Sequence, residues 1–390
     1  MYSSCPVCES TEIYELANIS EMPVYCNVLH ANRGSALGAA KGDIGLVFCK
    51  QCTHVFNQAF DPEQMAYSVE YENSLHYSGV FSEFSEQLAQ GLVREFNLND
   101  KNIIEIGCGK GDFLHSLCSK GNSSGVGFDK SFDATRFDKA EMPNVTIRQE
   151  FYDENHAEVP VDFLCSRHVL EHIQYPVDFL KTVTRVSTAE ANFDVYIEVP
   201  NGLFTLRDFG VWDIIYEHCS YFTPVSLAEC FHRAGCGVTS LEETFSGQFL
   251  SLKGRRFEGQ VAGLEGDGRV QEYLKYAVSF NEQYQALKDS WHNKLEDYLS
   301  SGKKVVIWGA GSKGVTFLNV FGSASNIDYA VDLNPHKIGM YVPGGGQEVV
   351  APGFLTSYGP DVIIVMNPVY LDEIASQVQA LGVEAEIVVV

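Results

Sequence analysis

The sequence predicts an α/β protein with two Rossmann-like units and a small cysteine-bearing head. Between residues 101 and 240, apolar segments typical of strands alternate with helical segments; the apolar ones are IIEIG, SGVGFD, VDFLCS and DVYIEVP. A second alternation begins at residue 301 with KKVVIWGAGSKGVTFLNV. Because parallel strands need crossover connections, such alternation indicates parallel sheets covered by helices. The 390 residues leave room for two or three domains.

The composition excludes several classes of partner. The chain has 51 acidic and 27 basic residues and a formal charge of −24, which repels the phosphate backbone of nucleic acids. No run of 18 or more apolar residues is present, and the N-terminus MYSSCPVCES does not read as a signal peptide. The eleven cysteines are odd in number. These features predict a soluble cytoplasmic protein with reduced thiols that binds neither nucleic acid nor a membrane.

Two C-x-x-C pairs mark the head, which we place at residues 1–65. They are Cys5 with Cys8 and Cys49 with Cys52. Four thiolates from two tight turns suit tetrahedral zinc, and a zinc ion with four protein ligands is structural rather than catalytic. The alternative is a thioredoxin-like redox pair, which normally lies between a strand and a helix. His54 is close in sequence and is expected to be a bystander.

A glycine-rich turn follows a helical segment at residues 84–96. The stretch from Ile103 to Leu114 reads IIEIGCGKGDFL, a strand that enters a turn and then a helix. Glycine at positions 107, 109 and 111 tolerates positive φ and lets the backbone approach a ligand closely. The alternating Gly107, Gly109 and Gly111, with Glu105 before them, resemble motif I of the class I S-adenosylmethionine (SAM) methyltransferases. The resemblance implies that these four residues bind SAM; the alternative is an ordinary turn between strand and helix.

Further residues are expected to complete the SAM site. Asp129 ends the second strand, where an acidic residue holds ribose hydroxyls in nucleotide sites of this type. Tyr152, in a later loop, is expected to contact the adenine. Ser166 and His168 end the strand VDFLCS and begin a segment that resembles the H-x-L-E-H signature of class I methyltransferases, which closes the SAM pocket.

The HVLEHI segment is expected to begin a helix with His168 and His172 on one face. That spacing is compatible with zinc, but the H-E-x-x-H order is absent, so we expect no metal there.

Three acid–base groups stand together at Tyr216, Glu217 and His218, and Tyr221 follows them. A histidine with a near-neutral pKa is suited to removing a proton from carbon. The alternative is a packed polar cluster at the start of a helix.

Taken in order along the chain, these features resemble the three-domain SAM-dependent sugar C-methyltransferases, which act on nucleotide-linked 4-keto sugars. The likeness rests on the cysteine pairs, on EIGCGKGDFL, and on four further strings: YENSLHYSGVF at 71–81, EH-x-x-YF with GQFL at 247–250, VVIWGAGSKGVTFLN, and DLNPHKIGMYVPG. It implies a zinc-binding head, a class I methyltransferase unit at 66–260, a spacer helix within 261–300 and a C-terminal Rossmann-like unit at 301–390.

The resemblance also implies roles for individual residues. His218 would remove the proton next to the ketone with help from Tyr216 and Glu217, and Tyr71, Tyr77 and Tyr221 would line the substrate side. SAM is already an activated electrophile, so the remaining task is to make a carbon nucleophile and to stabilise its enolate oxygen. A tyrosine hydroxyl or a bound water would serve that oxygen. The chain departs from the family pattern because Tyr216 directly precedes Glu217.

A second glycine loop opens the C-terminal unit. Gly309, Gly311 and Gly314 follow the strand KKVVIW, and Asp332 closes the next strand. By motif alone this is a dinucleotide fingerprint, which makes a nicotinamide-dependent sugar oxidoreductase a rival hypothesis. The family resemblance implies instead that Gly309, Gly311, Lys313, Asp332 and Lys337 help to hold a nucleotide sugar.

The leading hypothesis is therefore SAM-dependent C-methylation of a nucleotide-linked sugar by a monomer or homodimer. It competes with O- or N-methylation of a sugar or another small molecule, and with a scaffold that has no activity.

Overall fold

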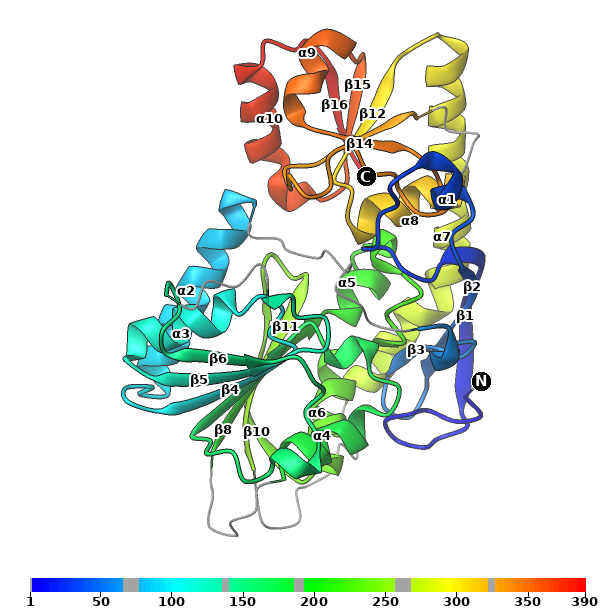
Figure 1. Cartoon of the computed structure of the whole chain (residues 1–390). Coiled ribbons are helices and arrows are strands. Elements are labelled where there is room, and N and C mark those ends of the chain that lie inside the picture. The colour runs from blue at the N-terminus through cyan, green and yellow to red at the C-terminus, as the bar shows by residue number, and fades with distance from the viewer. Residues whose placement is uncertain (1, 66–76, 135–139, 186–192, 257–267, 322–326) are drawn as a thin grey trace.

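The computed structural model describes residues 2–65, 77–134, 140–185, 193–256, 268–321 and 327–390 (Figure 1). Tyr71, predicted to line the substrate, lies outside these residues. The described residues form three sheets, two of them mainly or wholly parallel, so the predicted α/β fold class is confirmed. No described helix is long and apolar enough to cross a membrane.

The head is an antiparallel sheet that borrows a strand from the middle of the chain. Its order is β1 (Ile13–Pro23), β2 (Lys41–Cys49), β3 (Val55–Asn57) and β9 (Ser220–Tyr221), with α1 (Arg33–Leu37) between β1 and β2. Register shifts within the β1–β2 pairing break the alternation of apolar and polar residues by which strands are recognised.

The central unit is a seven-stranded sheet in the order β10-β11-β8-β7-β4-β5-β6. Its strands are β4 (Asn102–Ile106), β5 (Ser124–Phe128), β6 (Val145–Arg148), β7 (Phe163–Arg167), β8 (Asp194–Pro200), β10 (Cys236–Thr244) and β11 (Phe249–Arg256). Strands β4 to β8 pair in parallel, whereas β11 is antiparallel to both β8 and β10. The helices are α2 (Gly79–Glu95), α3 (Asp112–Gly121), α4 (Pro176–Val183), α5 (Gly202–Leu206) and α6 (Pro224–Arg233). The antiparallel hairpin was not predicted.

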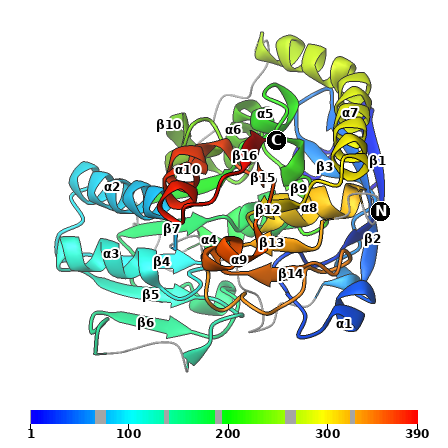
Figure 2. The ribbon, with the colours of Figure 1, turned by 90° about the horizontal axis from the view of Figure 1, so that it is seen from above.

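A single helix connects this unit to the C-terminal one. Helix α7 (Arg269–Ser300) runs beside β1, and Asn281 Nδ2 donates to the Leu16 carbonyl at 2.9 Å (Figure 2). The C-terminal sheet is parallel throughout, in the order β14-β13-β12-β15-β16. Its elements are β12 (Val305–Trp308), α8 (Ser312–Phe321), β13 (Tyr329–Val331), β14 (Glu348–Val350), α9 (Leu355–Tyr358), β15 (Val362–Val365), α10 (Leu371–Ala380) and β16 (Glu386–Val389).

Short 3₁₀ turns occur at η1 (Pro62–Gln64), η3 (Glu154–His156), η4 (Leu170–His172), η5 (Val211–Asp213), η7 (Pro352–Phe354) and η8 (Pro368–Tyr370). The turn η4 corrects one expectation. His168 and His172 do not share a helical face, because His168 adopts a positive φ of 54° and the next α-helix begins only at Pro176.

One apolar core holds the three units together. Phe48 of the head, Phe222 of the central unit, Phe280 of α7 and Phe317 of α8 are all fully buried in the same cluster of side chains. Burial of such large side chains is the main source of stability, so we expect the units to keep a fixed arrangement.

Candidate active site

The predicted SAM turn lies between β4 and α3. Gly107, Gly109 and Gly111 all have positive φ, at 71°, 55° and 86°. A Cβ on Gly107 would come within 2.1 Å of Val169, which follows β7, so glycine allows these two loops to pack together. A Cβ on Gly109 would meet nothing within 4 Å. The backbone at Gly109 therefore borders open space, as the cradle of a small ligand must.

Two carboxylates flank this turn. Asp129 Oδ2 accepts a hydrogen bond from the Gly109 amide at 2.7 Å, and Oδ1 accepts from the Ser131 amide at 2.8 Å. Glu105 is buried, and its Oε2 has no hydrogen-bond partner among the described residues. Burial raises the pKa of Glu105 to about 8. An unpaired buried carboxyl fits the amine of a SAM molecule, because that cation would compensate its charge.

The other residues expected to bind SAM lie near the same ends of the parallel strands. Tyr152 is nearly buried and packs edge-on against Phe128, with ring centroids 5.0 Å apart. The Ser166 hydroxyl donates to the Ile106 carbonyl at 2.9 Å, so it ties β7 to β4. The Ser166 hydroxyl therefore holds the end of β4, just before the glycine turn, in place.

A buried ion pair supports the loop after β7. Arg167 Nε donates to Glu198 Oε1 at 2.8 Å, and His168 Nε2 lies 3.2 Å from the same oxygen. The hydroxyl of Tyr196 donates to Glu198 Oε2 at 3.0 Å. These contacts fix the position of His168, which the structure places on the wall of a cavity.

Removing one partner of this pair tests its contribution to stability. Glu198→Gln is expected to destabilise the protein by about 3–5 kcal/mol, because the Arg167 charge would stay buried without a counter-charge. Burial opposes ionisation of Glu198, but Arg167 and His168 outweigh it and lower the pKa of the carboxyl to about 2. The stabilisation is therefore complete above the unfolded pKa of about 4.3 and is lost as pH falls toward 2. Urea unfolding at neutral pH and at about pH 3 measures this, and equal stability of variant and wild type at neutral pH would contradict it.

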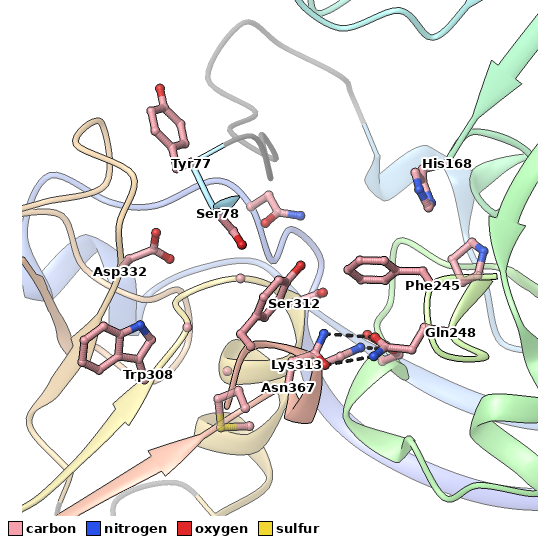
Figure 3. A pocket seen from close by; sticks show the side chains of 18 of the residues that line it. Tyr77, Ser78, His168, Phe245, Gln248, Trp308, Ser312, Lys313, Asp332 and Asn367 are labelled. Carbon is pink, nitrogen blue, oxygen red and sulfur yellow. Dashed lines mark hydrogen bonds and ion pairs between the residues drawn. The ribbon is translucent and has the colours of Figure 1, made fainter. Parts of the chain in front are cut away.

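The cavity, of about 300 Å³, lies between the central and C-terminal units. Figure 3 shows His168 and Phe245 on its central side, Trp308 and Asp332 on its C-terminal side, and Tyr77 at its edge. Gly107 packs against Val169, and Val169 directly follows His168 in the chain. The predicted SAM turn is therefore close to this cavity. The geometry brings the predicted SAM turn and this cavity together at one edge of the sheet.

Three acid–base side chains gather on the central side of the cavity. Donor atoms of Glu171, His172 and His218 all lie within 4.8 Å of one another. His172 Nδ1 lies 3.0 Å from the Glu217 carbonyl, which as an acceptor fixes the proton on Nδ1. Burial lowers the pKa of His172 to about 4, and burial together with the neighbouring His172 lowers the pKa of His218 well below its usual value. Both imidazoles are therefore neutral at physiological pH.

Neighbours of His218 that were predicted to be catalytic point elsewhere. The Tyr216 hydroxyl accepts from the Asp61 amide at 3.0 Å, and Glu217 Oε2 accepts from the Cys26 amide at 3.0 Å. The buried Tyr221 hydroxyl donates to the Ile215 carbonyl at 3.1 Å. Tyr216, Glu217 and Tyr221 are not among the residues that line the described cavity. The structure therefore does not bring these three side chains to the cavity wall, because residues 216 and 217 lie in a turn before β9 and their polar groups bond to main-chain atoms of the head.

The C-terminal glycine loop forms the opposite wall. Gly309, Gly311, Lys313, Asp332 and Lys337 all line the cavity, as expected from the sequence. Asp332 Oδ2 accepts from the Ala310 amide at 3.0 Å, and the buried Lys337 Nζ donates to the Ala310 carbonyl at 3.1 Å. Lys313 forms an ion pair with Asp213 of the central unit. Both lysines therefore lie beside acidic side chains of the same cavity.

The contacts that join the two walls were not predicted from the sequence. Gln248 and Asn367 exchange two amide hydrogen bonds of 2.9 and 3.0 Å, drawn as dashed lines in Figure 3. Ser78 Oγ donates to Glu373 Oε2 at 2.7 Å. Each pair joins residues more than a hundred positions apart, so no local sequence pattern predicts the contact. The one sequence feature that pointed to this region was the GQFL string, which contains Gln248.

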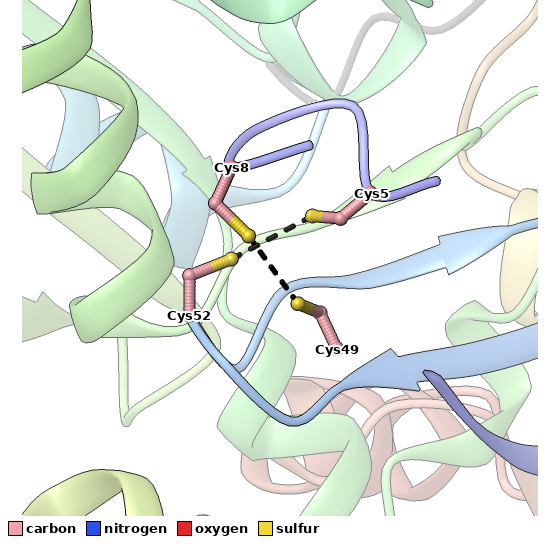
Figure 4. Close-up of side chains that lie close together, drawn as sticks. All are labelled: Cys5, Cys8, Cys49 and Cys52. Atoms are coloured by element: carbon pink, nitrogen blue, oxygen red, sulfur yellow. Dashed lines mark hydrogen bonds between the residues drawn. The ribbon is translucent and has the colours of Figure 1, made fainter. Parts of the chain in front are cut away.

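The four predicted zinc ligands meet at one point of the head (Figure 4). The sulfur of Cys5 is 3.6 Å from that of Cys52, and the sulfur of Cys8 is 3.4 Å from that of Cys49. Tetrahedral zinc with bonds of about 2.3 Å places its sulfurs about 3.8 Å apart. The cluster is therefore compatible with a zinc ion.

Two family models match the chain. Residues 81–241 match the family model of a methyltransferase domain, and residues 259–390 match that of a C-methyltransferase C-terminal domain. The chain thus contains a methyltransferase domain. The mitochondrial ubiquinone biosynthesis O-methyltransferase of Dictyostelium discoideum is 26% identical over 190 residues, 41% of this methyltransferase. The match spans 56% of that relative, little more than half its length.

Two solved structures show a remote likeness to this methyltransferase. One is a SAM-dependent methyltransferase from Aquifex aeolicus, 16% identical, with a TM-score of 0.37 over 50% of this chain and 99% of that one. The other is magnesium protoporphyrin IX methyltransferase from Synechocystis PCC 6803 with bound SAH, 14% identical, with a TM-score of 0.33 over 45% and 84% of the two chains.

Proposed function

We propose that this methyltransferase adds a methyl group to the carbon next to a ketone in a nucleotide-linked sugar. One observation carries the proposal. The cavity places His218 and its acid–base neighbours opposite the glycine loop of a C-terminal unit that matches a C-methyltransferase domain. A ligand that spans the cavity would thus meet a proton acceptor at one end and helix amides at the other.

We propose that Glu105, Gly107, Gly109 and Asp129 hold SAM, with Tyr152 near its adenine. Bound SAM supplies a methyl group that is already electrophilic. The chain's own residues would then have to make the carbon nucleophile. His218, neutral and on the cavity wall, is the proposed base, because a neutral imidazole accepts a proton and its burial excludes competing water.

We propose that the sugar's diphosphate binds at the N-terminus of α8. The amides of Gly311 and Ser312 begin a ten-residue helix whose dipole favours an anion. Lys313 would exchange its contact with Asp213 for the phosphate. The cavity also contains Asp213, Asp332 and Glu373, so a substrate with additional negative charge would be repelled.

The test is calorimetry with SAH and a panel of uridine- and thymidine-diphosphate sugars, followed by turnover with SAM labelled in its methyl carbon. C-methylation predicts a new carbon–carbon bond in the product by NMR. It also predicts deuterium uptake from solvent at the α carbon. Binding of SAH with no uptake and a methyl group on oxygen would replace the proposal with O-methylation.

That second function is favoured by one observation, the 26% identity to an O-methyltransferase over 190 residues. An oxygen acceptor needs less help from a base, so His218 variants would then retain more activity. The nicotinamide alternative predicts turnover with NAD or NADP. In the structure both oxygens of Asp332 already accept backbone amides, from Ala310 and Asn334.

We also propose that Cys5, Cys8, Cys49 and Cys52 hold a structural zinc ion. Metal analysis should find about one zinc per chain. Cys5→Ser with Cys8→Ser is expected to remove it and to lower Tm by more than about 5 °C, because β3 and its partner β9 lose their anchor. Cys118→Ser, in a buried cysteine of α3, is the control that should keep the metal. Freshly purified reduced protein without zinc would contradict the proposal.

A further inference from the structure

Glu171 is a buried carboxyl on the wall of the cavity, and the proposed methyl transfer as described above gives it no role. It lies in the turn η4, is 2% exposed, and lines the cavity beside His172 and His218. Its Oε2 is buried and makes no hydrogen bond to any described residue. A buried polar atom without a partner costs about 1–3 kcal/mol. A carboxyl on the wall of the cavity with such an oxygen is suited to a hydrogen bond with the substrate.

The groups around Glu171 favour its protonated form. Three histidines face it: His168, whose Nδ1 is 3.7 Å from Oε1, and the largely neutral His172 and His218. The carboxylate of Glu198, on β8, lies behind it, and the Cys219 thiol contacts its main-chain carbonyl at 3.5 Å. Burial, with a smaller contribution from Glu198, raises the pKa of Glu171 to about 8. At neutral pH the side chain is therefore a carboxylic acid with a proton to share.

Two of the four tyrosines that the sequence analysis placed on the substrate side, Tyr216 and Tyr221, are used elsewhere. The Tyr216 hydroxyl bonds to the main chain of Asp61, and that of Tyr221 bonds to the main chain of Ile215. An enolate needs a hydrogen-bond donor at its oxygen, and such donors are worth about 10²–10³-fold in rate. Glu171 and the proposed base His218 lie on the same wall of the cavity.

We propose that Glu171 is a catalytic residue that donates a hydrogen bond to the carbonyl oxygen of the substrate and stabilises the enolate formed there. This role rests on the proposed C-methylation. In the step, the α carbon–hydrogen bond breaks and its proton moves to His218. The electron pair moves through the new carbon–carbon double bond onto the carbonyl oxygen. That oxygen gains a negative charge, which the Glu171 hydroxyl group stabilises without giving up its proton.

The protonation state is tested without substrate. Infrared difference spectra between wild type and Glu171→Gln at neutral pH should show the C=O band of a protonated carboxyl in the wild type alone. The band should disappear as pH rises through about 8, where the carboxyl ionises. Glu229→Gln, at an exposed helix pair with Arg233, is the matched control and should leave that band in place. A wild type without such a band has an ionised Glu171, and this would overturn the proposal.

The catalytic role is tested by deuterium uptake at the α carbon of a thymidine-diphosphate 4-keto-6-deoxy sugar with SAH bound. Glu171→Ala should lower the uptake rate by about 10²–10³-fold. Glu171→Gln keeps a hydrogen-bond donor, so its uptake rate should fall by less than about tenfold. Because glutamine does not ionise, the variant should not show the decline in rate above about pH 8 that the wild type shows. Equal rates and the same alkaline decline in all three proteins would overturn the proposal.

Two further outcomes are decisive. If the wild type takes up no deuterium from any keto sugar of the panel, the proposed C-methylation fails, and the role of Glu171 fails with it. A divalent ion is the competing occupant, since Glu171, His172 and His218 offer three donor atoms to one point. If wild type binds one metal ion more than Glu171→Gln does, Glu171 is an ionised ligand and the proposal is wrong.

Discussion

His218→Gln is expected to bind SAH as the wild type does and to lower kcat by about 10²–10⁴-fold, the usual contribution of a positioned general base. Glutamine has a similar size and polarity but cannot accept a proton at neutral pH. His218 lines the cavity proposed for the acceptor, whereas the proposed SAM turn at Gly107 to Gly111 is built from other elements. The loss should therefore fall on turnover and leave donor binding unchanged.

The pH dependence of the wild type follows from the same residue. Burial lowers the pKa of His218, so the base stays neutral, and activity should persist well below pH 6.5 before it falls. Steady-state rates from acid to neutral pH measure this, with SAH calorimetry as the check on folding. His292→Gln, an exposed histidine of α7, is the control. If His218→Gln turned over at the wild-type rate, His218 would not be the base.

Gly109→Leu is expected to weaken SAH binding by more than about 100-fold, or about 2.7 kcal/mol, without unfolding the protein. The new side chain would enter the open space that borders Gly109, where the structure places no protein atom within 4 Å. The left-handed backbone there adds a strain of about 1–2 kcal/mol. Calorimetry with SAH and thermal unfolding separate the two effects.

The matched control for that variant is Gly235→Leu. Gly235 also has a positive φ, of 79°, and open space around it, but it lies between α6 and β10. It should lose similar stability and keep SAH affinity. Gly107→Ala should behave differently, because its Cβ would clash with Val169 and displace the loop that bears His168. If Gly109→Leu and Gly235→Leu bind SAH equally well, SAM does not occupy this turn.

Local patterns predicted the parts of the site that lie within one strand–turn–helix unit. The glycines after β4, the loop after β12 and the long helix α7 each follow from a short stretch of neighbouring residues. The sulfur cluster was predictable because the C-x-x-C spacing itself forms each half of it. At these positions the local constraint and the global fold agree, so the sequence pattern alone was informative.

Side-chain direction could not be predicted in the same way. Tyr216, Glu217 and His218 are consecutive, yet only His218 lines the cavity, because the short strand β9 pairs with β3 of the head and orients this segment. Likewise η4 is a single 3₁₀ turn rather than the start of the expected helix, and it places Glu171 and His172 on the cavity wall. Neither outcome is encoded in the spacing of the residues concerned.

The α/β class, the glycine turn after β4, the second glycine loop and the four clustered thiols could all be predicted from the sequence. Each of these depends on backbone geometry that neighbouring residues dictate. Which side chains line the cavity depends instead on how the three units pack against one another. The cavity arises where the head, the central unit and the C-terminal unit pack together, and the Gln248–Asn367 and Ser78–Glu373 contacts join residues more than a hundred positions apart. Long-range packing of buried surface sets such contacts, and no local pattern records it.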